Sequence, residues 1–78
     1  MLLDFEKVKL KLNNYKVSLN MDSNNIENYY VSELLLNKVL DEIEEEEYDK
    51  DEIEEIIFKN GLKASIYLKN NKKTTVKL

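Results

Sequence analysis

Residues 62–78 read LKASIYLKNNKKTTVKL, and this stretch decides the fold class because apolar and polar side chains alternate on both sides of Asn70-Asn71. A period of two is typical of a strand with one buried face. Asparagine tolerates a positive φ, so the Asn pair marks a hairpin turn. A three-residue loop of residues 70–72 keeps the apolar side chains of both strands on one face. The expected cross-strand pairs are Leu68–Thr74, Ile66–Val76 and Ala64–Leu78.

A similar pattern lies near the start of the chain, where residues 8–21 read VKLKLNNYKVSLNM. The alternation predicts two more strands, and Asn13-Asn14 predicts a two-residue turn between them. This register also places apolar side chains opposite one another on a single face. The expected pairs are Leu12–Tyr15, Leu10–Val17 and Val8–Leu19.

Two helices are predicted between the hairpins. Ser32 is a suitable N-cap for a first helix that runs to about Glu46. Asp49, with Glu52 three residues later, resembles a capping box and would start a second helix that ends at Asn60-Gly61. For residues 22–31, a short strand and an early turn of the first helix both remain open. The residues expected to be buried are Leu36, Val39, Leu40 and Ile43 in the first helix and Ile53, Ile56 and Ile57 in the second.

These elements predict one α+β domain over residues 1–78, in the order ββααββ. We expect a four-stranded, mainly antiparallel sheet made of the two hairpins, with the helical pair packed on one face. A chain of 78 residues is near the lower limit for a core that is stable without disulfides or metals.

The composition argues against several function classes. The chain has no cysteine or histidine, which removes thiolate and imidazole chemistry, and one glycine does not suffice for a phosphate-binding loop. Asp49 and Asp51 have calcium-ligand spacing, but the ligand and the glycine that should follow are missing, so no metal site is expected. We therefore expect no enzyme, no catalytic residue and no cofactor. With no apolar run of membrane-spanning length, the chain is predicted to be cytoplasmic, in the host cell if the gene is viral.

The charge is strongly segregated. Eleven of the fifteen residues from Asp41 to Glu55 are carboxylates and one is lysine, so this block carries −10, while the rest of the chain carries +6. Residues three or four apart on a helix are neighbours, so these acids would form rows whose like charges repel. Such a row resembles the phosphate track of a nucleic acid in sign and density. A solubilising, solvated helix surface is the alternative interpretation.

The outward face of the predicted sheet should carry lysines around one aromatic residue, Tyr67. A solvated face that discourages aggregation is the simpler interpretation, and nucleic-acid binding is the other. Direct nucleic-acid binding is not expected, because the net charge is −4 and only one stacking aromatic is present. The lysines assigned to this face are Lys7, Lys9, Lys11, Lys16, Lys63, Lys69, Lys73 and Lys77.

The leading functional hypothesis is a small acidic inhibitor that mimics nucleic acid and occupies the basic groove of a nucleic-acid-binding protein or nucleoprotein complex. Phage-encoded anti-CRISPR and anti-restriction proteins are similar to this chain in size, acidity and lack of catalytic residues. The alternative is a general interaction module, such as an antitoxin, a regulatory subunit or a homodimer, with Tyr30 and Leu34 as apolar anchors. The expected partner-binding residues are Glu44, Glu45, Glu46, Glu47, Tyr48, Asp49, Asp51, Glu52, Glu54, Glu55, Tyr30 and Leu34.

Overall fold

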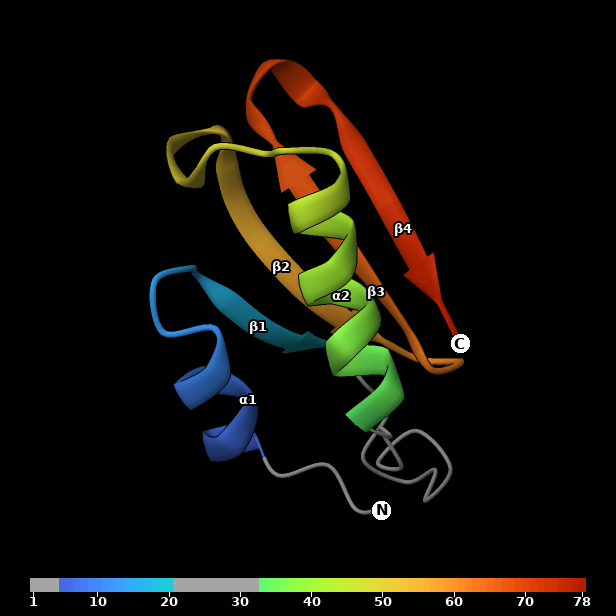
Figure 1. Ribbon diagram of the computed structural model, residues 1–78. Coiled ribbons are helices and arrows are strands. Elements are labelled where there is room, and N and C mark those ends of the chain that lie inside the picture. Colours follow the sequence, from blue (N-terminus) through green and yellow to red (C-terminus); the bar gives the residue numbers. More distant parts are fainter. Residues whose placement is uncertain (1–4, 21–32) are drawn as a thin grey trace.

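A four-stranded mixed sheet and two α-helices make up the described part of this computed structural model, residues 5–20 and 33–78 (Figure 1). The α+β class is confirmed, whereas the predicted order ββααββ is wrong, because the observed order is α-β-α-β-β-β. Along the chain the elements are α1 (Phe5–Lys11), β1 (Val17–Asn20), α2 (Glu33–Glu45), the 3-10 turn η2 (Lys50–Glu52), β2 (Ile53–Lys59), β3 (Lys63–Leu68), the 3-10 turn η3 (Lys69–Asn71) and β4 (Lys73–Lys77).

The sheet has the strand order β1-β2-β3-β4 and is only partly antiparallel. β1 pairs with β2 in parallel, with Val17 opposite Ile56, and the backbone N–H of Ile56 donates to the Lys16 carbonyl at 2.8 Å. The pairs β2–β3 and β3–β4 are antiparallel. Two adjacent parallel strands require a long crossover, and α2 lies in that connection. The parallel pair was not expected, because the first hairpin was predicted in its place.

The predicted second helix is wrong, because residues 53–59 form the central strand β2. The spacing of Ile53, Ile56 and Ile57 suggested a helix, but a register irregularity between Ile53 and Glu55 adds one residue to this strand. A β-bulge of this kind lets two residues three apart face the same side. Ile53 and Ile56 are accordingly both buried in the core, and Ile57 lies on the opposite face. Asn60-Gly61 begins a hairpin turn and does not end a helix, and Gly61 has a φ of +82°.

The predicted first hairpin is also wrong, because residues 5–11 form α1. Val8 and Leu12 are four residues apart, and both are buried on the side of this helix that faces the core. Leu10, which continued the strand-like alternation, is 75% exposed. Glu6 in the first turn and lysines in the last turn suit the helix dipole. A helix of seven residues is marginal by itself, so the docking of Val8 and Leu12 decides its conformation.

The C-terminal hairpin is confirmed, with a shift of its loop. The three-residue connection is Lys69–Asn71, one position earlier than predicted, and the observed pairs include Ala64–Val76 and Ile66–Thr74. Moving the loop by one position changes the register by two residues, so every side chain stays on its predicted face. Asn70 and Asn71 have φ values of 66° and 62°, the conformation that asparagine was expected to supply.

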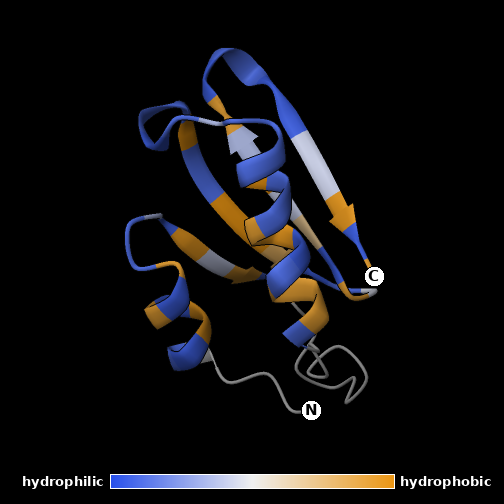
Figure 2. Cartoon of the chain, viewed as in Figure 1, coloured by the Kyte–Doolittle hydropathy of each residue, from blue (hydrophilic) through white to orange (hydrophobic). Residues whose placement is uncertain are grey.

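One apolar cluster lies between the helices and the sheet. The predicted first helix is confirmed as α2, and Figure 2 shows apolar residues on α2 where it crosses β2 and β3. Both helices contribute buried side chains to this cluster, so the opposite sheet face is turned away from them. None of the described helices is long and apolar enough to cross a membrane. The question about residues 22–31 falls outside the described residues. The cluster contains Val8, Leu12, Leu35, Leu36, Val39, Ile43, Ile53, Ile56, Phe58, Ala64, Ile66, Leu68 and Val76.

A charged contact joins α1 to the start of α2. The ammonium group of Lys7 donates to the carboxylate of Glu33, and the two groups form a salt bridge. This hydrogen bond, together with the nearby charges of Lys11 and Lys7, lowers the pKa of Glu33 below 4.5. Both side chains are nearly half exposed, so the contact orients α1 and contributes little to stability.

Candidate functional site

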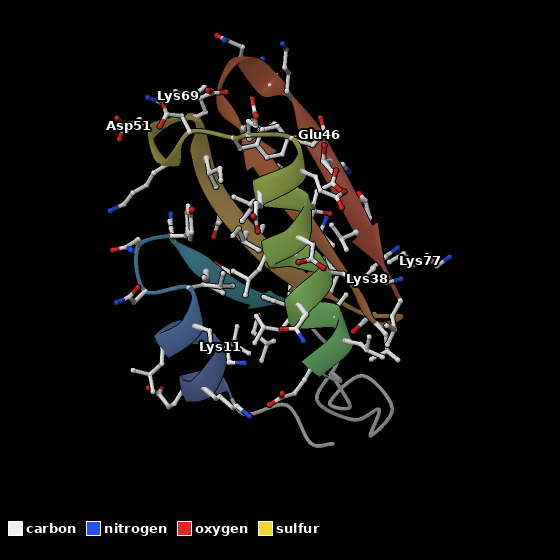
Figure 3. The ribbon with its side chains drawn as sticks, in the orientation of Figure 1. Lys11, Lys38, Glu46, Asp51, Lys69 and Lys77 are labelled. Atoms are coloured by element: carbon white, nitrogen blue, oxygen red, sulfur yellow. The ribbon has the colours of Figure 1, made fainter. Side chains whose placement is uncertain are left out.

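The acidic block is concentrated at one end of the molecule, in the connection from α2 to β2. Its carboxylates lie on the last turns of α2, on the loop that follows, on η2 and on the start of β2. Figure 3 labels Glu46 and Asp51, which lie on the two sides of this connection. We call the exposed carboxylates of this region the acidic end. They are Glu44, Glu45, Glu46, Glu47, Asp49, Asp51, Glu52 and Glu54.

The acidic end lies on different secondary-structure elements from those predicted. A pair of helices was expected to carry the acids, but only the first part lies on a helix, because η2 and β2 follow. Residues along a strand point alternately to opposite faces, so Glu54 and Glu55 do not extend a helical row. Glu55 is half-buried and accepts a hydrogen bond from the Ser18 hydroxyl of β1. It therefore belongs to the sheet and not to the acidic end.

The backbone of the acidic end is held by a helix-terminating motif. The N–H of Tyr48 donates to the Ile43 carbonyl, and the N–H of Glu47 donates to the Glu44 carbonyl, both at 3.1 Å. These two bonds define a Schellman motif, in which the residue at the Glu47 position is left-handed. Glycine is preferred there, yet Glu47 occupies it with a φ of 52°. A charged residue is thus fixed in a conformation that costs about 1–3 kcal/mol for a non-glycine residue.

Tyr48 has a structural role within this region. It was predicted to contact a partner, but its side chain is only partly exposed and packs against the core. Its hydroxyl lies 3.0 Å from the Thr74 hydroxyl of β4, within hydrogen-bond distance. The contact attaches the connection to the far edge of the sheet and keeps the acidic end in place.

Within residues 5–20 and 33–78, no carboxylate of the acidic end forms a salt bridge with a lysine, although Lys50 lies among these acids and Lys69 follows Leu68, the residue paired with Ile53. Across residues 5–20 and 33–78, the salt bridge in the structure is Lys7–Glu33, which lies outside this region. No group of three or more acids within those residues is arranged to hold a metal ion. The last turn of α2 has no basic residue, so the acids there also face the negative end of the helix dipole. Repulsion and the dipole both act against this local structure.

The two predicted apolar anchors have different outcomes. Leu34 on the first turn of α2 is 61% exposed, although its neighbours Leu35 and Leu36 are buried. Leu34 was not among the residues expected to be buried in the first helix, and its exposure agrees with this. Tyr30 lies outside the described residues.

The sheet face turned away from the helices carries the second charged surface, which we call the open face. The strand registers arrange its side chains in cross-strand rows. One row is Asn20, Lys59, Lys63 and Lys77, the next is Ser18, Ile57, Ser65 and Thr75, and the third includes Glu55, Tyr67 and Lys73.

The predicted lysine face is therefore correct only for its C-terminal half. Lys63, Lys73 and Lys77 lie on it with Tyr67, whereas Lys7, Lys9 and Lys11 lie on α1 and Lys69 lies in η3. Lys16 directly precedes β1, and its carbonyl accepts from the N–H of Ile56. Lys59 lies on this face as well, although it was not predicted there, because it was assigned to the end of a helix. Asn60-Gly61 between two apolar runs is a strong hairpin signal, and it would have placed Lys59 on a strand.

The side chains of Lys59 and Tyr67, which belong to the two outer rows of the open face, extend toward each other and meet above the middle row. The Lys59 ammonium donates to the Tyr67 hydroxyl at 2.7 Å, although the two residues are not directly opposite. Ser65 lies between their rows and is only 1% exposed, because the two long side chains meet above it. The hydrogen bond from Lys59, with the charges of Lys59 and Lys73, lowers the pKa of Tyr67 below its ordinary value of 10.0.

Two ammonium groups lie near the Tyr67 ring, and neither is close to its centroid. The Lys59 nitrogen is 5.1 Å from the ring centroid, nearly twice its distance from the hydroxyl oxygen, so it lies beyond the hydroxyl end. The Lys73 nitrogen is 5.8 Å from the centroid, at the outer limit of a cation–π contact.

Comparison of the chain with protein-family models, curated protein sequences and solved structures found no match. The two charged surfaces are therefore the features from which a function can be proposed.

Proposed function

We propose that the chain is a protein-binding inhibitor whose acidic end occupies a basic nucleic-acid-binding groove of another protein. The observation that carries this proposal is the set of eight exposed carboxylates on one connection, none of which forms a salt bridge with a lysine of the described residues. A partner rich in lysine and arginine would supply the missing counter-charges. The attraction would accelerate association and weaken as salt is added.

The local energetics support a functional role for these acids. Neutral residues at the end of α2 would avoid the like-charge repulsion, and glycine would suit the Glu47 position better. Like-charge crowding and a non-glycine residue in a left-handed conformation both lower stability here. Such unfavourable local features, when nothing in the structure compensates for them, are more often found at functional sites than elsewhere. A purely solubilising surface requires neither a left-handed glutamate nor this crowding.

In this proposal the protein mimics the charge of nucleic acid, as anti-CRISPR and anti-restriction inhibitors of phages do, and acts in the cytoplasm of the host. Catalysis has no part in it. The backbone of the acidic end is held by the Schellman motif and by the contact of Tyr48 with Thr74. A fixed array of charges binds with less loss of conformational entropy than a mobile one.

The test compares two variants with the same change in net charge. Glu46→Gln, Asp51→Asn and Glu52→Gln together remove three charges from the acidic end. The control variant Asn13→Lys, Asn14→Lys and Asn37→Lys adds three positive charges at exposed positions elsewhere. Each chain is immobilised and exposed to nuclease-treated bacterial lysate, and the captured proteins are eluted with salt.

The captured proteins are then tested for binding to labelled DNA or RNA in competition with the free chain. We expect the wild type and the control to displace the nucleic acid, and the neutralised variant to lose most of this competition. Equal capture by the neutralised variant, or captured proteins that bind no nucleic acid, would reject the proposed function.

A second candidate is a self-associating interaction module. The specific observation in its favour is the exposure of two large apolar side chains, Leu10 at 75% and Leu34 at 61%. Light scattering at low and high salt separates the two candidates, because an inhibitor of the proposed kind remains a monomer under both conditions.

A further inference from the structure

We propose that the open face binds single-stranded nucleic acid, independently of the acidic end. From the sequence, such binding was not expected, because the net charge is −4 and only one stacking aromatic is present. The strand registers change this argument, because they bring Lys59 to the face and align three lysines in one row.

The row of Lys59, Lys63 and Lys77 is the main observation. Lys59 is directly opposite Lys63 on β2 and β3, and Lys63 is directly opposite Lys77 on β3 and β4. Like charges in directly opposite positions destabilise a sheet, which applies to Lys63 and Lys77, whereas the Lys59 ammonium extends from the row toward the Tyr67 hydroxyl. No acid belongs to this row, whose β1 member is Asn20. A polyanion lying across the three strands would relieve the repulsion.

Tyr67 supplies a stacking surface beside these charges. The hydrogen bond from Lys59 fixes the hydroxyl end of the ring without covering its faces. Strand residues rise about 3.3 Å each, so the Tyr67 row lies about 13 Å from the lysine row, which is four residues away. The row between them consists of the small or uncharged residues Ser18, Ile57, Ser65 and Thr75.

This combination favours a single strand as the ligand. Proteins that bind single strands without sequence preference pair a cationic surface with an aromatic ring on which a base stacks. In a duplex the bases are already stacked and paired, so the ring of Tyr67 would have no partner. Lys73 lies opposite Tyr67 on β4 and is placed to contact the adjacent phosphate, on the side away from Glu55, which lies opposite Tyr67 on β2 and accepts from the Ser18 hydroxyl.

The net charge of −4 does not prevent this contact. At physiological ionic strength the screening length is about 8 Å, and the molecule is 33 Å long. Figure 3 shows Lys77 at the end of β4, far from Glu46 and Asp51. The distant part of the lysine row is therefore largely screened from the acidic end.

The test measures the fluorescence anisotropy of a labelled oligonucleotide of about 15 nucleotides, as oligo-dT and as oligo-U, over a series of salt concentrations from low to physiological, because the acidic end is screened from the lysines only at the upper end of the series. The variant Lys63→Gln/Lys77→Gln is expected to bind on the order of tenfold more weakly, and the slope of log affinity against log salt should fall by about 0.7 per lysine. Thermal stability should be retained or raised, because repulsion is removed. A purely structural role for these lysines would lower stability and binding together.

The matched control is Lys11→Gln/Lys50→Gln, which changes the net charge equally at exposed positions off the open face. We expect it to bind nearly as the wild type does. Tyr67→Ala should weaken binding about tenfold by removing a stacked base, whereas Tyr67→Phe, which keeps the ring, should not.

The proposal is overturned if neither oligonucleotide binds the wild type at any salt concentration in the series, or if the control loses as much affinity as the lysine-row variant. Equal binding of a duplex with no effect of Tyr67→Ala also overturns it. If the lysine-row variant only dissociates a dimer, the face binds a second copy of the chain and not a nucleic acid. These outcomes do not affect the proposal for the acidic end, which is tested with its own variants.

Discussion

At the scale of single residues, Glu47 is the position where local structure and residue type disagree. Its backbone has a φ of 52°, and two hydrogen bonds of the Schellman motif hold it there. Glycine adopts this conformation without a steric penalty, whereas a side chain with a Cβ does not. If the acidic end binds a basic partner, Glu47 is retained for its charge despite its effect on stability.

We expect Glu47→Gly to stabilise the fold by about 1 kcal/mol, because it relieves the left-handed backbone and one repulsive charge. Urea unfolding followed by circular dichroism measures the change. Glu44→Gly removes the same side chain from within α2 and should instead destabilise by about 1 kcal/mol. Destabilisation by both substitutions would contradict the motif.

Tyr67 is the second residue whose surroundings alter its chemistry. Lys59 and Lys73 favour the phenolate, so the pKa of the Tyr67 hydroxyl is lower in the folded than in the unfolded chain. The resulting stabilisation is present above pH 10.0 and is lost as pH falls through the lowered value, so it is absent near neutral pH. This titration is a probe of the Lys59–Tyr67 contact.

We expect the tyrosinate absorbance of the wild type to appear at lower pH than in Tyr67→Phe, which lacks this hydroxyl. Lys59→Gln should raise the pKa of Tyr67, because its largest cause is the hydrogen bond from Lys59. A titration that is unchanged by Lys59→Gln would show that the contact is absent in solution.

At the scale of elements, α2 determines how the sheet is covered. Leu35 is completely buried, while the preceding residue, Leu34, is 61% exposed. The two leucines share chemistry and helix turn but differ in environment. Their substitution therefore tests the rotation of α2 about its axis.

We expect Leu35→Ala to destabilise the protein by about 2–5 kcal/mol through lost burial and a cavity. This is a large part of the about 4–12 kcal/mol expected for a chain of this size. Leu34→Ala should change stability by less than about 0.5 kcal/mol. Chemical denaturation measures both, and similar effects of the two substitutions would mean that α2 is rotated differently.

At the scale of the whole molecule, charge is distributed unevenly over the two surfaces. No carboxylate of the acidic end forms a salt bridge with a lysine among the described residues, and the open face has a row of adjacent lysines. In each region, like charges lie close together and repel one another. Salt screens such repulsion between exposed charges, so the fold should be sensitive to ionic strength.

We expect the melting temperature to rise by about 5 °C as salt increases from about 10 to 150 mM, if screening relieves about 1 kcal/mol of repulsion. The variant Glu46→Gln/Asp51→Asn/Glu52→Gln should melt higher at low salt and respond less. Differential scanning calorimetry gives both values. A melting temperature that falls with salt would mean that attractive pairs dominate.

The sequence alone determined the features that depend on local chemistry. The segment of α2 has the length and the apolar stripe of a helix, and the C-terminal hairpin has alternation on both sides of an asparagine turn. The acidic block is a property of composition, so its exposure at one end survived a wrong assignment of the elements that carry it. Only the loop of the hairpin moved, by one position, which left its faces unchanged.

Only the tertiary structure decided the conformations of residues 5–11 and 53–59. A short segment of either type is marginal alone, so its partners select it. Val8 and Leu12 reach the core as a helix, and the bulge at Glu54 lets Ile53 and Ile56 reach it as a strand. The parallel pairing of β1 with β2 follows from the α2 crossover, and with it the rows of the open face. Long-range pairing of this kind leaves no periodic signal within either segment, because each contact joins residues distant in sequence.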